Sequence, residues 1–96
     1  MKPSEALRIH RQAIRDIVAR NLARNARVFG SAARGDDAEG SDIDVLVDPM
    51  PGATLLNLGA LQIELEEALG LRVDLLTPGD LPPKFRERVL REAVVV

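Results

Sequence analysis

The sequence contains no cysteine, no tryptophan and no tyrosine, and its only aromatic residues are Phe29 and Phe85. Without cysteine the chain can form neither a disulfide nor a thiolate metal site. Two phenylalanines cannot build a platform on which nucleic-acid bases stack. The net charge of −2 also argues against nucleic-acid binding, which usually requires a basic excess. We therefore expect no direct contact with nucleic acid.

Long apolar runs are missing as well. No stretch approaches the roughly 18–20 apolar residues of a membrane span, so we expect no contact with a membrane. The arginine-rich N-terminal segment lacks the apolar core of a signal peptide, which predicts a cytoplasmic protein. The 96 residues suffice for one small domain, and we expect a single domain over 1–96. Such a domain buries only about 60–65% of its unfolded surface, so its core is thin and a partner subunit would add to it.

Helix and strand patterns alternate along the chain. Apolar residues at helical spacing predict a first helix from Ser4, its cap, to about residue 24. The other predicted elements are strands over 26–30, 43–47 and 72–76, a loop over 31–41, a helix over 54–69 and a last helix from about 82 to 93. This order predicts an α/β (α+β) fold in which helices pack on a small mixed β-sheet.

The helix predicted over 54–69 is rich in leucine, and its apolar residues cover more than one stripe. A helix of this kind is either deeply buried or has a second apolar face that contacts a partner. The sequence leaves both possibilities open.

Two aspartates, Asp42 and Asp44, stand at the start of the strand predicted over 43–47. Side chains alternate between the faces of a strand, so both carboxylates point one way while Ile43 points into the core. Adjacent carboxylates repel each other unless a cation lies between them, and their hard oxygens suit Mg²⁺. The pair therefore indicates a magnesium site, and two solvated aspartates are the alternative.

Gly30 and Ser31 follow the first predicted strand. A glycine there lets phosphate oxygens approach the backbone, and its amides with the Ser31 hydroxyl can donate hydrogen bonds. Arg34 stands in the same turn and could reach a triphosphate, although solvent exposure is equally compatible with the sequence. The other polar residues nearby, Asp36, Asp37 and Glu39, are interpreted as ordinary loop residues.

A third carboxylate, Asp74, lies between Val73 and Leu75 in the strand predicted over 72–76. Its apolar neighbours predict burial, which is costly for an aspartate that neither pairs nor binds metal. If this strand lies beside the strand over 43–47, Asp74 joins the other two carboxylates. Asp42 and Asp44 would then hold Mg²⁺ against a triphosphate, while Asp74 binds a second ion and accepts the proton of an attacking hydroxyl.

The segment GSAARGDDAEGSDIDVLVD, with ten residues between Gly30-Ser31 and Asp42-Ile43-Asp44, resembles the signature of the DNA polymerase beta-like nucleotidyltransferase superfamily. It is similar in particular to the minimal nucleotidyltransferase branch. The resemblance implies a palm-like fold and a transfer reaction that uses ATP and two Mg²⁺ ions. It also implies that Asp42, Asp44 and Asp74 are catalytic and that Gly30, Ser31 and Arg34 bind the nucleotide.

Minimal nucleotidyltransferases commonly act as antitoxins beside an all-helical HEPN toxin, whose tyrosine they modify with AMP. The resemblance therefore implies a HEPN-type toxin as acceptor and a hetero-oligomer as the working assembly. The chain has no tyrosine of its own, which excludes self-modification on tyrosine. Two alternatives stay open: a binding module that neutralises its partner by occlusion, and nucleotidyl transfer to a small molecule.

Overall fold

A four-stranded mixed sheet organises the computed structural model, which describes residues 1–96. The strands β1 (Ala23–Phe29), β2 (Ile43–Pro49), β3 (Val73–Leu76) and β4 (Val94–Val95) lie in the order β3-β2-β1-β4. β1 is antiparallel to β2 and β4, whereas β2 and β3 are parallel. The predicted mixed sheet is confirmed, and β4 is an additional strand that the sequence did not predict.

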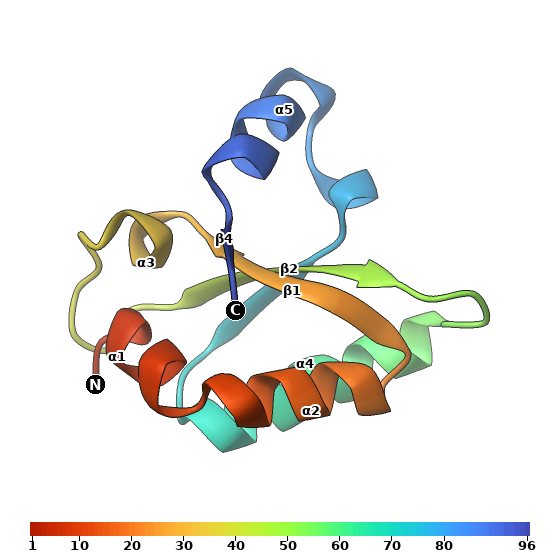
Figure 1. Cartoon of the computed structure of the whole chain (residues 1–96), viewed down its shortest axis with the longest axis horizontal. Coiled ribbons are helices and arrows are strands. Elements are labelled where there is room, and N and C mark those ends of the chain that lie inside the picture. The colour runs from red at the N-terminus through yellow and green to blue at the C-terminus, as the bar shows by residue number, and fades with distance from the viewer.

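The helices lie mainly on one side of this sheet. Figure 1 shows α1 (Pro3–Ile9), α2 (Arg11–Arg20) and α4 (Leu55–Leu69) together on one side, with α5 (Pro83–Glu92) on the other. α2 packs against both α4 and β1. The short helix α3 (Ser31–Arg34) follows β1, and the 3₁₀ turn η1 (Pro78–Asp80) follows β3. No helix of the structure is both long enough and apolar enough to cross a membrane.

The core lies between the helical layer and the sheet. In β2, Ile43, Val45 and Val47 belong to the main apolar cluster, to which α2 and α4 also contribute. The residues between them, Asp44 and Leu46, point to the opposite face because strand side chains alternate. The carboxylates of β2 therefore lie on the face of the sheet that α1, α2 and α4 do not cover.

The prediction of one continuous first helix that is capped by Ser4 is wrong. The structure has two helices, separated at His10 (φ −107°, ψ 20°). Pro3 occupies the first turn, where its fixed φ favours helix initiation, so α1 begins before Ser4 and Lys2 is the residue at its cap. The left-handed backbone of Leu22 (φ 57°) turns the chain into β1 earlier than the predicted residue 26.

Helix α4 matches its predicted range closely. Thr54 and Asn57 form a capping box at its start, and Gly70 ends it in the left-handed conformation (φ 67°). Only one side is buried, through Leu61, Leu65 and Leu69. Two leucines at the start of the helix, Leu55 and Leu56, are each 85% exposed. The apolar surface of α4 is thus divided between the core and solvent.

Candidate active site

The parallel pairing of β2 and β3 places Asp44 directly beside Asp74 in register. Neighbouring residues in register on adjacent strands point to the same face of the sheet. The two strands are therefore adjacent, which is the condition under which Asp74 is expected to join Asp42 and Asp44. The predicted burial of Asp74 is wrong, because β3 is the edge strand of the sheet and leaves this side chain exposed.

Asp44 is half-buried, and its surroundings disfavour negative charge. Burial raises the pKa of the Asp44 carboxyl to about 6, and the charge of Asp74, its hydrogen bond and the charge of Asp42 add to the effect. The Arg34 guanidinium opposes this shift. The charged form of Asp44 is therefore held in an unfavourable field that a bound cation would relieve.

Asp42 lies just before β2 and is exposed. The hydrogen bonds of the strand begin one residue later, where the Ile43 N–H donates to the Arg72 carbonyl oxygen at 3.0 Å. Asp42 is thus a residue of the preceding loop rather than of the strand. Its charge nevertheless acts on Asp44, which places the two carboxylates in one electrostatic environment.

Gly30 connects β1 to α3 beside the carboxylates. Its backbone (φ 71°, ψ −149°) lies in a region that essentially only glycine adopts. A Cβ atom added here would also overlap the Asp44 Oδ2 atom. Glycine is therefore required both by the backbone conformation and by the close approach of the Asp44 carboxylate.

The segment after Gly30 is a short helix and not only a loop, which corrects the prediction for 31–41. Ser31 is its first residue and is half-buried. Arg34 ends it, is exposed, and donates from Nε to Asp36 Oδ2 at 3.4 Å. The structure therefore places the Gly30-Ser31 turn next to Asp44 and leaves Arg34 at the rim with a weak ion pair.

The carboxylates of the site could provide two ligands to Mg²⁺, but they do not form a complete coordination shell. No group of three carboxylate, histidine or cysteine side chains converges in a metal-binding arrangement. Mg²⁺ usually takes one or two carboxylates from a protein and completes its octahedron with water and substrate phosphates. Asp44 and Asp74, side by side in register with the Gly30 backbone close to one of them, match that requirement.

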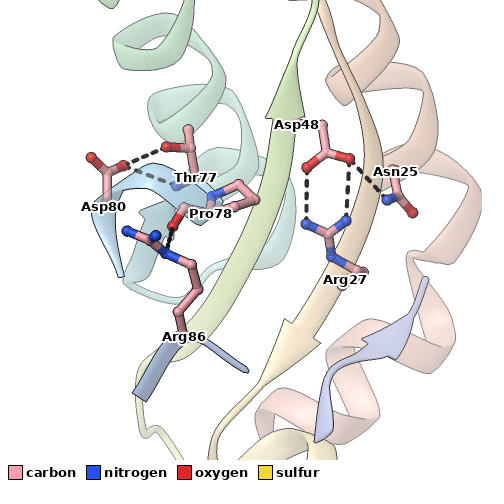
Figure 2. A network of polar contacts seen from close by, with 7 residues as sticks. All are labelled: Asn25, Arg27, Asp48, Thr77, Pro78, Asp80 and Arg86. Carbon is pink, nitrogen blue, oxygen red and sulfur yellow. Dashed lines mark hydrogen bonds and ion pairs between the residues drawn. The ribbon is translucent and has the colours of Figure 1, made fainter. Parts of the chain in front are cut away.

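Two polar networks outside the candidate site were not predicted from the sequence. Figure 2 shows Arg27 of β1 donating to both carboxylate oxygens of Asp48 in β2, at 3.3 and 3.0 Å. Arg27 is buried, and it holds the pKa of the Asp48 carboxyl below its usual range. In the second network Arg86 of α5 donates to the Pro78 carbonyl oxygen (Figure 2). It also donates to the Leu81 carbonyl oxygen, and the two bonds tie α5 to the η1 segment. Apolar periodicity does not predict such contacts, because it carries no information on the partner of a polar side chain.

Comparison with known proteins gives one family. The model of the nucleotidyltransferase domain matches residues 8–96. A Methanocaldococcus jannaschii protein named as a protein adenylyltransferase, MJ0435, is 45% identical over 83% of this chain and 86% of its own length. The protein adenylyltransferase MntA of Thermococcus cleftensis is 41% identical over 94% of this chain and 88% of its own length.

Solved structures agree with this result. A structure described as a minimal nucleotidyltransferase matches with a TM-score of 0.87 and 46% identity, over 97% of this chain and 95% of that one. The crystal structure of a toxin–antitoxin with AMP-PNP matches with a TM-score of 0.73 over 88% of this chain and 69% of that one. At 22% identity, this second likeness concerns the fold alone.

The fold and the carboxylate edge therefore define a nucleotidyltransferase, and the chain belongs to the nucleotidyltransferase domain family. Within that family it groups with the minimal nucleotidyltransferases, as the predicted resemblance implied.

Proposed function

We propose that this nucleotidyltransferase transfers AMP from ATP to a tyrosine of a partner toxin in the cytoplasm and so acts as an antitoxin. The observation that carries the proposal is the register of Asp44 and Asp74 at the sheet edge, with the Gly30 backbone against Asp44. A carboxylate pair beside a backbone that only glycine can form suits a metal-bound triphosphate.

Each residue of the candidate site has a proposed role in the transfer. Asp44 would be the shared ligand: with Asp42 it would hold Mg²⁺ against the triphosphate, and beside it in register Asp74 would contribute to a second ion and accept the proton of the attacking hydroxyl. Gly30, Ser31 and Arg34 contact the phosphates through amides, a hydroxyl and a guanidinium. Bound Mg²⁺ supplies neutralisation of the charge on the triphosphate. The tyrosine oxygen bonds to the α-phosphorus, the bond from that phosphorus to the β-phosphate oxygen breaks, and pyrophosphate leaves.

A protein acceptor is supported by three observations. The two relatives described above are named as protein adenylyltransferases, and the AMP-PNP structure is that of a toxin–antitoxin. This chain has no tyrosine that it could modify on itself. The exposed Leu55 and Leu56 on α4 offer an apolar surface to a partner. We therefore propose a HEPN-type helical toxin as the acceptor and a hetero-oligomer as the assembly.

The proposal is tested by incubating the chain with labelled ATP, Mg²⁺ and the product of the adjacent gene. We expect label on that protein, and at least a 100-fold loss of transfer with Asp42→Ala or Asp44→Ala, since both remove charge aimed at the metal and phosphates. Asp16→Ala on α2 is the control, because Asp16 is exposed and bonds only Gln12 of its own helix. Absence of transfer by the wild type, or full transfer by Asp42→Ala, would refute the proposal.

Neutralisation by occlusion is the second candidate, and the exposed leucines of α4 are the observation that favours it. In that case binding alone silences the partner. An Asp42→Ala/Asp44→Ala double variant would then neutralise the toxin as well as the wild type does, whereas Leu55→Ser/Leu56→Ser would not. If transfer is required, the double variant fails to neutralise although it still binds.

A further inference from the structure

The loop that leads from α3 to Asp42 is tied to the N-terminal end of the chain by three contacts. The Ser4 N–H donates to Asp37 Oδ2 at 2.8 Å, and the Gly40 N–H donates to the Met1 carbonyl oxygen at 3.2 Å. The Met1 ammonium group also pairs with Glu39. A segment whose composition suggests an ordinary exposed loop is thus attached to α1.

Asp37 is the buried member of this set, with 7% of its surface exposed. Lys2 provides no side-chain cap for α1, so the carboxylate of Asp37 satisfies the Ser4 N–H from 33 residues away. The hydrogen bond from Ser4 lowers the pKa of the Asp37 carboxyl despite its burial. The interaction is therefore between a charged carboxylate and an otherwise unpaired backbone donor, which is a strong type of hydrogen bond.

The chain between Asp37 and Asp42 is short and internally bonded. The Ser41 N–H and its hydroxyl both donate to the Ala38 carbonyl oxygen, at 3.2 and 2.8 Å. This turn connects Asp37 to Asp42, which lies before the first residue of β2. Asp42 is therefore fixed from its N-terminal side by the turn and its attachment to α1.

We propose that Asp37 is a positioning residue, which anchors the 38–41 turn to α1 and thereby holds the Asp42 carboxylate in the geometry that binds metal. The inference rests on the proposed function of Asp42 as a metal ligand. In this proposal Asp37 acts through Asp42 and is not itself a ligand of metal or nucleotide. Outer residues that orient a metal ligand typically change metal affinity by about 10–100-fold when removed.

The test measures Mn²⁺ binding to the full chain, through the paramagnetic broadening of the Asp42 and Asp44 amide signals. Asp37→Ala is expected to raise the half-saturating Mn²⁺ concentration about 10-fold. Asp37→Asn keeps an acceptor oxygen at the same place and is expected to recover most of that loss. Hydrogen exchange at the Ser4 and Gly40 amides is expected to speed up in the alanine variant.

Asp80→Ala is the matched control. Asp80 accepts from the Thr77 N–H at 2.9 Å at the start of η1, so this variant also removes a cap, but in another segment. It is expected to leave Mn²⁺ affinity unchanged at an equal folded fraction.

The possible outcomes separate this inference from the proposed function. Unchanged Mn²⁺ affinity in folded Asp37→Ala would overturn the positioning role while leaving transfer intact. Equal losses in the Asp37 and Asp80 variants would overturn it too, because they would reflect general destabilisation. If wild-type signals of Asp42 and Asp44 are not broadened by Mn²⁺, both the inference and the metal site fail. Normal broadening without transfer would count against the proposed function only.

Discussion

Replacing Gly30 with alanine introduces two separate penalties at the carboxylate edge. The first is backbone strain, because φ 71° and ψ −149° is a conformation that costs a non-glycine residue about 1–3 kcal/mol. The second is steric, because the new Cβ overlaps Asp44 Oδ2 and the carboxylate must move. We expect Gly30→Ala to lose about 2 kcal/mol of stability, which for a domain of this size lowers Tm by about 8–16 °C.

The activity of Gly30→Ala should fall by more than its stability explains. A displacement of about 1 Å at a reacting group can cost on the order of 100-fold in rate. The assay is AMP transfer at a temperature where the variant remains folded, together with thermal unfolding followed by circular dichroism.

Gly52→Ala is the control for this experiment. Gly52 also has a positive φ (91°), but it lies in the turn between β2 and α4, and an added Cβ there meets no atom within 4 Å. It should lose stability through backbone strain while keeping its activity per folded molecule. If Gly30→Ala is as active per folded molecule as Gly52→Ala, the reasoning about the Asp44 contact is refuted.

Further variants test the sheet and the surface of α4. Asp48→Ala leaves the buried Arg27 unpaired and should cost about 1–3 kcal/mol in a urea titration, and a cost near zero would show that the pair is not stabilising. Because Arg27 lowers the pKa of Asp48, the stabilisation by this ion pair is present above the unfolded pKa near 4 and is lost as pH falls through the lower folded pKa. Acid unfolding of the wild type and of Asp48→Asn, compared from pH 6 to 2, measures this loss, and parallel unfolding curves would contradict it. Leu65→Ala opens a cavity at a fully buried position and should cost about 2–5 kcal/mol. Leu56→Ser, at an 85% exposed position, should change stability by less than about 0.5 kcal/mol while weakening partner binding in a pull-down, and unchanged binding would remove this residue from the interface.

Local signals in the sequence predict those parts of the candidate site that depend on nearby residues. Gly30-Ser31 and Asp42-Ile43-Asp44 lie within one short segment, so glycine chemistry applies directly to Gly30 and strand alternation to Ile43 and Asp44. Alternation does not extend to Asp42, which lies in the loop before β2. The α4 helix was predicted well because its cap and Gly70 are local in sequence. The division of its leucines between core and solvent does not follow from the sequence, since it depends on what packs against each side.

The order of the main elements, the mixed sheet and the three candidate aspartates could be predicted from the sequence alone. The three-dimensional arrangement of the strands was needed to show that Asp74 lies in register with Asp44 and is nevertheless exposed on an edge strand. It was also needed to show that the buried Asp37 accepts from the Ser4 N–H of a helix 33 residues away and that Gly30 leaves room for the Asp44 carboxylate. The physical reason is common to all three: strand register, edge position and long-range hydrogen bonds depend on which segments meet in space, and local periodicity carries no information about that.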